Sequence, residues 1–175
     1  MIDLLYFHGL GSNKESRKFK RIKNAFDSSH SCFCVEWRND TDISGLLTDL
    51  WSLYKDKEEL VLIGDSTGGN FAYQLRERLK VSGVKIKLVL LNPLLDFSNR
   101  IASFPFPEKL EKSLEKIKEI DHCFLLQSNR DEVIDHSQMK IGPEVEQLII
   151  DDTHRLLTFE KYVDAIKEYL TSDRL

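Results

Sequence analysis

The chain has 175 residues, of which 41% are hydrophobic and 31% are charged, and its formal net charge is −4 at pH 7. This is the composition of an ordinary globular protein, and a domain of this length buries roughly 70% of the surface of its unfolded chain. The negative balance argues against a nucleic-acid partner held by phosphate contacts. We therefore expect one domain over residues 1–175.

The cysteines and the apolar runs bear on location and on metal binding. The chain starts without an apolar signal peptide and has three cysteines, Cys32, Cys34 and Cys123, which favours a reducing, cytoplasmic setting. No apolar run approaches the roughly 20 residues needed to span a bilayer. Cys32 and Cys34 alternate with apolar residues as strand positions do, and no further ligands lie near them, so we expect no metal site.

Strand and helix patterns alternate from one end of the chain to the other. Short apolar runs predict six strands, at residues 2–7, 31–37, 60–63, 86–91, 122–127 and 145–150. Apolar stripes at helical spacing predict helices over residues 19–26, 43–54, 71–79, 110–117 and 159–170. Such alternation predicts a compact α/β fold, with a mostly parallel six-stranded sheet and helices on both faces.

The first predicted helix is rich in lysine and arginine. Ser12, with Glu15 three residues later, forms a capping box that would start this helix. Phe19, Ile22 and Phe26 fall on one side of it. The basic residues between them are therefore expected to form a solvated helix face rather than a phosphate-binding patch.

The third strand ends in a G-x-S-x-G pentapeptide, Gly64 to Gly68, which passes directly into a helical pattern. A sharp turn from strand to helix holds the central side chain in a strained conformation, and the flanking glycines leave room for close packing. The pattern is that of a nucleophile elbow, which would hold Ser66 clear of the sheet. The pentapeptide alone also fits a serine that merely begins a helix, but the strand before it and the helix after it favour a catalytic serine.

Ligands of a parallel sheet bind outside the carboxyl ends of its strands. A serine there needs a base to take its proton, a task that histidine performs near neutral pH, and a carboxylate to orient that histidine. His154, four residues past the last strand, is the expected base for Ser66. Asp131, after the fifth strand, is the expected acid, with Asp135 and Asp96 as alternatives.

Other residues near the strand ends are given different roles. His136 is a distant alternative as the base, and Glu132 is expected to face solvent. His8 is expected to hold the loop after the first strand by hydrogen bonds. His30 and His122 belong to the opposite edge of the sheet, out of reach of Ser66.

A hydrolytic serine also needs donors for the negative charge of its tetrahedral intermediate, and losing one such donor costs about 2.7 to 4 kcal/mol. The backbone N–H that follows the nucleophile is one donor, which selects Thr67. The second is expected from the loop after the first strand, where Leu10 follows His8 and Gly9.

The segments Tyr6–Ser12 and Gly64–Asn70 together resemble the α/β-hydrolase superfamily. Within it, the small size and the run from His8 to Lys18 resemble the compact bacterial esterases of the YqiA and YcfP type. The resemblance implies hydrolysis of a small-molecule carboxylic ester or thioester without a cofactor. It carries the catalytic roles over to the serine, acid, histidine and two backbone amides named above.

Two features bear on how well such a site would work. Asp151 and Asp152 directly precede His154, where the resembled esterases tend to have glycines, and added carboxylates could raise the pKa of the base or alter access to it. The segment 93–107 lacks periodicity and lies where α/β-hydrolases usually insert a cap. Its apolar side chains form either a short lid over an acyl pocket or part of the core.

One alternative function stays open at this point. A non-catalytic member of the same fold would bind a small ligand or a protein partner in the same cleft.

Overall fold

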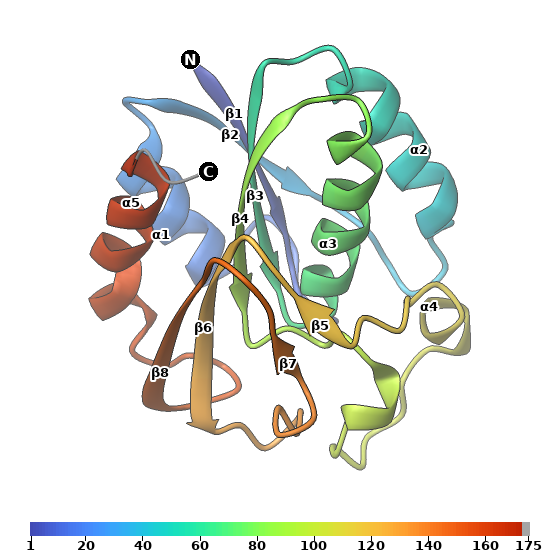
Figure 1. The fold of residues 1–175 in the computed structure, drawn as a ribbon. Coiled ribbons are helices and arrows are strands. Elements are labelled where there is room, and N and C mark those ends of the chain that lie inside the picture. The colour runs from blue at the N-terminus through green and yellow to red at the C-terminus, as the bar shows by residue number, and fades with distance from the viewer. Residues whose placement is uncertain (173–175) are drawn as a thin grey trace.

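A six-stranded sheet forms the centre of the protein, and helices cover both of its faces (Figure 1). The structure is a computed structural model that describes residues 1–172. All five strand pairings are parallel, in the order β2-β1-β3-β4-β6-β8. The strands are β1 (Ile2–Phe7), β2 (His30–Val35), β3 (Glu59–Asp65), β4 (Lys85–Leu91), β6 (Cys123–Arg130) and β8 (Val145–Thr153). The predicted α/β fold with its six-stranded parallel sheet is confirmed.

The helices form two layers. Helices α1 (Arg17–Phe26) and α5 (Val163–Thr171) cover one face, and α2 (Ile43–Tyr54) and α3 (Thr67–Lys80) cover the other (Figure 1). A 3₁₀ turn, η2 (Phe159–Tyr162), leads into α5. Because successive strand side chains point to opposite faces, each central strand contributes to two separate apolar cores.

Helix α1 begins later than its sequence suggested. Its N-cap is Ser16, whose hydroxyl accepts the backbone N–H of Phe19 at 3.2 Å, so the capping box predicted at Ser12 and Glu15 is wrong. Asn13 competes for this segment, since its side chain accepts the N–H of Glu15 at 2.8 Å and forms a turn there. Ser12 consequently belongs to a loop.

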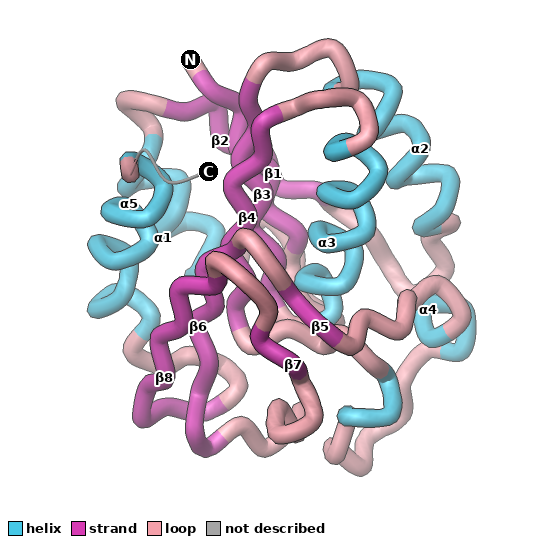
Figure 2. The backbone as a smooth tube through the Cα atoms, in the orientation of Figure 1, coloured by secondary structure: helices cyan, strands magenta, loops and turns pink. Residues whose placement is uncertain are grey.

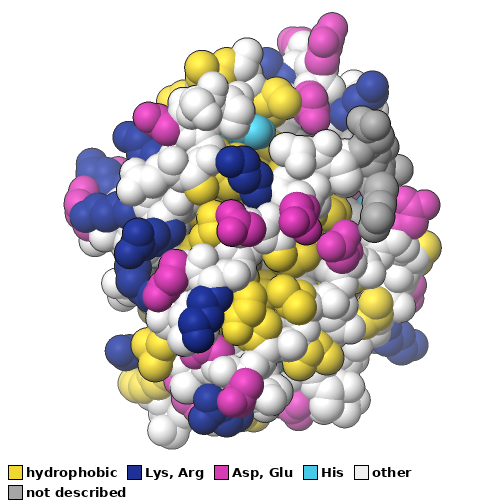
Figure 3. Space-filling model, turned by 90° about the vertical axis from the view of Figure 1, so that its left-hand side faces the viewer, with side chains coloured by type: hydrophobic (Ala, Val, Ile, Leu, Met, Phe, Trp, Pro, Cys, Tyr) yellow, Lys and Arg dark blue, Asp and Glu magenta, His cyan; other side chains and the backbone are white. Residues whose placement is uncertain are grey.

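The rest of α1 follows the prediction. Phe19, Ile22 and Phe26 are buried. On the face that carries α1 and α5, basic and acidic side chains are interspersed (Figure 3). Lys20, for example, lies 2.8 Å from Glu15. Most of the basic run is therefore a solvated helix face, as predicted. Lys18 is the exception, since its side chain is only 14% exposed and pairs with Asp65.

The helix predicted over residues 110–117 is only one turn long, α4 (Glu108–Glu111). The cause is Asn70 of α3, whose buried amide donates to the carbonyl of Glu115 at 2.9 Å and accepts the N–H of the same residue at 3.1 Å. The backbone N–H and C=O of Glu115 are thus both bonded to the Asn70 side chain, and neither is available for a helical hydrogen bond. The chain continues instead into β5 (Glu119–Ile120), which pairs with β7 (Lys140–Ile141) in a small second sheet.

Because the six central strands are all parallel, their carboxyl ends lie at one edge of the sheet. Connecting loops gather at this edge, at the bottom of Figure 2. The segment 93–107 reaches this edge with a short 3₁₀ turn, η1 (Phe97–Asn99), and an extended stretch. Arg100 forms an antiparallel bridge with Ile134, which ties the segment to the loop after β6. Among residues 1–172, no helix combines the length and the apolar character that crossing a bilayer requires.

Candidate active site

Ser66 occupies the sharp turn between β3 and α3. Its backbone has φ +53° and ψ −121°, a conformation that costs a non-glycine residue on the order of 1–3 kcal/mol. Three hydrogen bonds hold it there. Its N–H donates to the carbonyl of Leu91 at 2.9 Å, and its carbonyl accepts from Gly69 at 2.9 Å and from Leu94 at 3.0 Å. The predicted elbow is therefore present, and hydrogen bonds to β4 and α3 hold its strained backbone in place.

The elbow glycines are required by close packing. A Cβ atom on Gly64 would lie 2.5 Å from the Cα of Gly69. One on Gly68 would overlap the backbone carbonyls of Phe7 and His8. The first turn of α3 thus lies directly against the end of β1, which brings the loop after β1 next to the serine.

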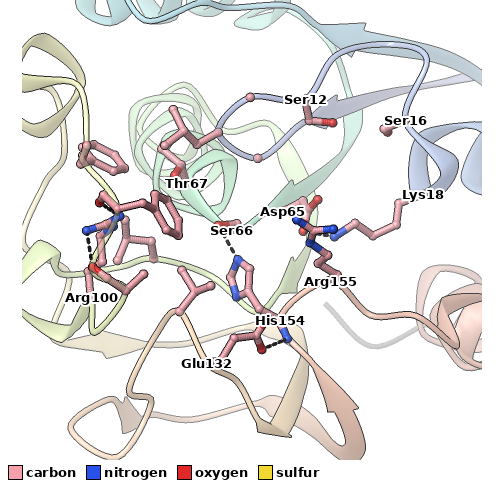
Figure 4. Close-up of a pocket in the computed structure, with 18 of the residues that line it drawn as sticks. Ser12, Ser16, Lys18, Asp65, Ser66, Thr67, Arg100, Glu132, His154 and Arg155 are labelled. Carbon is pink, nitrogen blue, oxygen red and sulfur yellow. Dashed lines mark hydrogen bonds and ion pairs between the residues drawn. The ribbon is translucent and has the colours of Figure 1, made fainter.

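Ser66, His154 and Asp131 form a continuous hydrogen-bonded chain. His154 Nε2 lies 2.9 Å from Ser66 Oγ (Figure 4). His154 Nδ1 lies 2.8 Å from Oδ2 and 3.0 Å from Oδ1 of Asp131. With a proton on Nδ1 donated to the carboxylate, Nε2 can accept the serine proton. The Asp131 side chain is only 2% exposed and that of His154 is 13% exposed.

Asp131 is held as a carboxylate by its own loop and by a second histidine. Its Oδ1 accepts the N–H groups of Val133 and Ile134, both at 2.9 Å, and its Oδ2 lies 2.9 Å from Nε2 of His136. Burial by itself raises the pKa of Asp131. The hydrogen bonds from His136, His154 and the backbone outweigh that effect and keep the pKa well below its usual value.

The alternative acids and the alternative base lie elsewhere. Asp135 is exposed and accepts the N–H of Ser137 at 2.9 Å. Asp96 accepts both the N–H and the hydroxyl of Ser98, at 2.9 and 2.7 Å. His136 contacts the carboxylate rather than the serine. Of the acids and histidines weighed from the sequence, Asp131 and His154 form the chain of hydrogen bonds that leads to Ser66, and His136 joins it behind Asp131.

His8 holds the neighbouring loop, as expected from the sequence. One ring nitrogen, Nδ1, lies 2.8 Å from the carbonyl of Gly9, and Nε2 accepts the N–H of Trp37 at 3.3 Å. The ring also stacks on Trp37, with centroids 4.7 Å apart. Burial lowers the pKa of His8, which fits a neutral ring that donates at one nitrogen and accepts at the other.

The two acids before His154 do not contact its ring. Asp152 is buried and accepts three backbone N–H groups and one hydroxyl from residues 153–158 of its own loop. Burial by itself raises the pKa of Asp152, but the hydrogen bonds to its carboxylate have the larger effect and lower the pKa to about 2. Asp151 instead pairs with Arg130 at 2.8 Å on the surface. Asp152 therefore shapes the loop that carries His154, a structural role that the sequence did not reveal.

Two further residues that sequence reasoning did not assign to the site hold the main chain of His154. The amide of Asn92, fully buried after β4, donates to the carbonyl of His154 at 3.1 Å and to Oγ of Ser128 at 2.9 Å. Glu132, expected to face solvent, is exposed but accepts the N–H of His154 at 2.9 Å. The one available signal was an asparagine directly after a buried strand.

The residue before the serine is also fixed. Asp65 is nearly buried, and its Oδ1 lies 2.6 Å from Nζ of Lys18. Its Oδ2 accepts the hydroxyl of Tyr6 at 3.2 Å. This pair connects α1 to the elbow.

Ser66 opens into a cavity of about 820 Å³. Leu10 and Thr67, the two predicted amide donors, are both among its lining residues, as is His154. So are several side chains of the segment 93–107. No group of three or more His, Cys, Asp or Glu side chains that could hold a metal ion occurs within residues 1–172.

Comparison with known proteins identifies the family. The model of a family described as alpha/beta hydrolase fold matches residues 20–148, and the chain belongs to this family. No match was found among curated protein sequences.

Solved structures with the same fold cover nearly the whole chain. Alpha/beta hydrolase domain-containing protein 10 from mouse is 13% identical, with a TM-score of 0.69 and coverage of 97% of this chain and 90% of that one. The monoacylglycerol lipase of Paleococcus ferrophilus is 15% identical, with a TM-score of 0.67 and coverage of 96% and 93%. RedJ-thioesterase from the prodiginine biosynthetic pathway in Streptomyces coelicolor is 10% identical, with a TM-score of 0.67 and coverage of 96% and 85%. At these identities the likeness establishes the fold.

Proposed function

We propose that this protein is a serine hydrolase that cleaves carboxylic esters or thioesters through an acyl-enzyme intermediate. One observation carries the proposal: the hydroxyl of Ser66, the ring of His154 and the buried carboxylate of Asp131 form one hydrogen-bonded chain at a cavity. Two of the similar folds are named as a thioesterase and a monoacylglycerol lipase, in keeping with this class of reaction.

In the first half of the reaction, Ser66 Oγ attacks the carbonyl carbon of the substrate while its proton passes to His154 Nε2. The new bond places negative charge on the former carbonyl oxygen. The backbone N–H groups of Leu10 and Thr67 are proposed to bind this oxygen. Asp131 stabilises the imidazolium and keeps the correct nitrogen facing the serine.

The intermediate then collapses. The bond to the alcohol or thiol breaks, and the leaving group takes the proton from His154 Nε2. Water attacks the acyl-enzyme in the second half, giving its proton to His154, and Ser66 departs with that proton to regenerate the enzyme. We propose that the segment 93–107 acts as a short lid over the acyl chain, with the apolar side chains that it contributes to the cavity.

A fluorophosphonate probe tests the nucleophile directly. We expect covalent labelling of the wild-type protein at Ser66, confirmed by peptide mass spectrometry. Labelling should be lost in Ser66→Ala and reduced at least a hundredfold in rate in His154→Ala, because the hydroxyl then lacks its base. Ser52→Ala, which changes an exposed serine of α2 outside the cavity lining, should label like the wild type.

A panel of 4-nitrophenyl esters and acyl thioesters of graded chain length tests the reaction class and sizes the cavity. A folded wild-type protein that neither labels nor hydrolyses any of them would refute the proposal. That result would favour instead a non-catalytic protein that binds a ligand in the same cavity.

A further inference from the structure

The cavity beside Ser66 has two chemically different sides. One side is apolar: the rings of Phe104 and Phe106 lie there under the guanidinium of Arg100. Leu94, Ala102 and Val133 are further apolar residues of the lining. The other side is polar. Figure 4 shows Ser12, Ser16, Lys18, Asp65 and Arg155 on that side of the Ser66–His154 pair, with Arg100 on the opposite side. A substrate that spans the serine therefore meets hydrocarbon in one direction and charge in the other.

Four cationic side chains line the cavity, and three of them are committed to fixed partners. Lys18 is paired with Asp65 at 2.6 Å. Arg17 donates to two backbone carbonyls at 2.5 and 2.8 Å, and Arg100 donates to another at 2.8 Å. These three cations hold loops and neighbouring elements together. The donors of all three are used within the protein, and the charges of Lys18 and Arg17 are paired with Asp65 and Glu160. Arg100 has no acidic partner among residues 1–172, but its guanidinium lies over the rings of Phe104 and Phe106, on the other side of the cavity from Arg155.

Arg155 is the fourth cation and differs from the others. It is exposed, and it has no hydrogen-bond or ion-pair partner anywhere in residues 1–172. Of the two acids in the lining, Asp65 is matched by Lys18. Glu132 lies on the far side of His154 and is used by a backbone N–H (Figure 4). The polar side of the cavity thus carries one unmatched positive charge, that of Arg155.

We propose that Arg155 binds a carboxylate on the leaving group, so that the preferred substrates are esters or thioesters with an acidic leaving group. This inference rests on the proposed hydrolase function. A hydrocarbon acyl chain is stabilised by burial against the apolar side. The leaving group must face His154 to receive its proton, and Arg155 is the next residue along that loop.

The guanidinium group of Arg155 favours a carboxylate over a phosphate as its partner. A guanidinium group offers paired donors that match the two oxygens of a carboxylate. One unmatched positive charge balances one carboxylate, whereas a phosphate with nearly two negative charges would call for further free cations. In the described residues, the other cations of the cavity lining have partners.

Two esters with the same acyl chain test this inference: 4-nitrophenyl butanoate and its carboxylated counterpart, 3-carboxy-4-nitrophenyl butanoate. Each variant is compared with the wild type on the same ester, which cancels the difference in leaving-group reactivity. Arg155→Gln should lower kcat/KM for the carboxylated ester about tenfold and change that for the neutral ester less than about twofold, the size of one charge-assisted hydrogen bond. Arg155→Lys should recover part of the loss.

Arg21→Gln is the matched control, because Arg21 is an exposed arginine on α1 outside the cavity lining. It removes the same charge from the chain and should leave both esters within about twofold of the wild type. An equal loss on both esters in Arg155→Gln, or no loss on the carboxylated one, would overturn the proposal.

A binding measurement tests the role of Arg155 independently of whether the protein hydrolyses esters. Calorimetry on Ser66→Ala measures the dissociation constant of the carboxylated ester without turnover. Adding Arg155→Gln to that variant should raise the constant about tenfold, and an unchanged constant refutes the role of Arg155 whether or not the wild type hydrolyses esters. Absence of both labelling and hydrolysis in the wild type would count against the hydrolase function instead.

Discussion

Nε2 of His136 lies 2.9 Å from Oδ2 of Asp131, the same carboxylate oxygen that meets the ring of His154. The side chain of His136 is only 5% exposed and does not line the large cavity. One imidazole therefore supports the acid from behind, and the other connects it to the serine. This arrangement makes His136 a positioning residue for the proposed reaction.

Replacing His136 should lower turnover without weakening substrate binding. In His136→Ala, Asp131 loses a hydrogen bond worth about 1.5 kcal/mol or more, and its hold on His154 loosens. We expect kcat to fall about tenfold with KM nearly unchanged, measured on a 4-nitrophenyl ester. His136→Gln, which can offer an N–H to the carboxylate, should retain more activity. An effect confined to KM would contradict this role.

The buried pair of Lys18 and Asp65 should show strong energetic coupling. In Lys18→Met, the Tyr6 hydroxyl is the one hydrogen-bond partner left to the buried Asp65 carboxylate among residues 1–172. We expect a loss of about 3 kcal/mol in the free energy of unfolding. Adding Asp65→Asn removes the unpaired charge and should restore at least about 1 kcal/mol. Urea unfolding of the two single variants and the double variant measures the coupling. Simple additivity would contradict it.

The loop that carries His154 should depend on Asp152 in a pH-dependent way. Asp152→Asn weakens four hydrogen bonds and is expected to cost about 2 kcal/mol at pH 7, or a melting temperature lower by about 5 °C. The pKa of Asp152 is about 2 in the folded protein and about 3.9 in an unfolded chain. Because its pKa is lower in the folded state, the ionised Asp152 carboxylate stabilises the folded protein above about pH 4. This contribution is lost as the pH falls toward 2 and the carboxylate is protonated.

The difference between wild type and Asp152→Asn should therefore narrow on acidification, as measured by urea unfolding at pH 7 and pH 3. Asp151→Asn is the control. Its exposed carboxylate pairs with Arg130 on the surface, and removing this charge should change the free energy of unfolding by less than about 1 kcal/mol. A constant difference between Asp152→Asn and the wild type across this range would show that the ionised carboxylate is not what stabilises the loop.

Gly68→Ala should disrupt the elbow more than an ordinary glycine substitution does. Its methyl group would overlap two backbone carbonyls at the end of β1, so we expect a loss of at least about 3 kcal/mol and of fluorophosphonate labelling. Gly83→Ala is the reference. Gly83 has φ +79° with nothing within 4 Å of its Cβ position, so only the cost of the backbone conformation, about 1–2 kcal/mol, applies. Equal thermal shifts for the two variants would contradict the packing argument.

Hydrophobic periodicity was sufficient to predict the sheet and most helices. The bounds of β1 and α2 coincide with the predicted ones, because the apolar pattern of each is strong and its apolar residues are buried in the core. The exceptions depend on single polar side chains. Asn70 ends α4 by a contact with a residue 45 positions away, a relationship that no local pattern contains. Ser16 caps α1 in place of Ser12 because Asn13 forms the intervening turn.

The candidate site, too, could be predicted from the sequence only in part. The order of serine, acid and histidine along the chain indicated which loops meet. Asp96, Asp131 and Asp135 all follow strands at the same edge, however, and only the three-dimensional arrangement pairs Asp131 with His154. Asn92 and Glu132 could not be assigned from sequence, since they act on the main chain of His154 rather than on a substrate.

Asn92 donates to the carbonyl of His154 and Glu132 accepts its N–H, so these two bonds hold the peptide groups on both sides of the residue and do not involve its ring. Both bonds can therefore form with another side chain at position 154, and we expect a variant without the histidine to keep the cavity and the fold. One substitution would separate a hydrolase from a binding protein built on the same scaffold, and the reverse change could restore activity without rebuilding the loop.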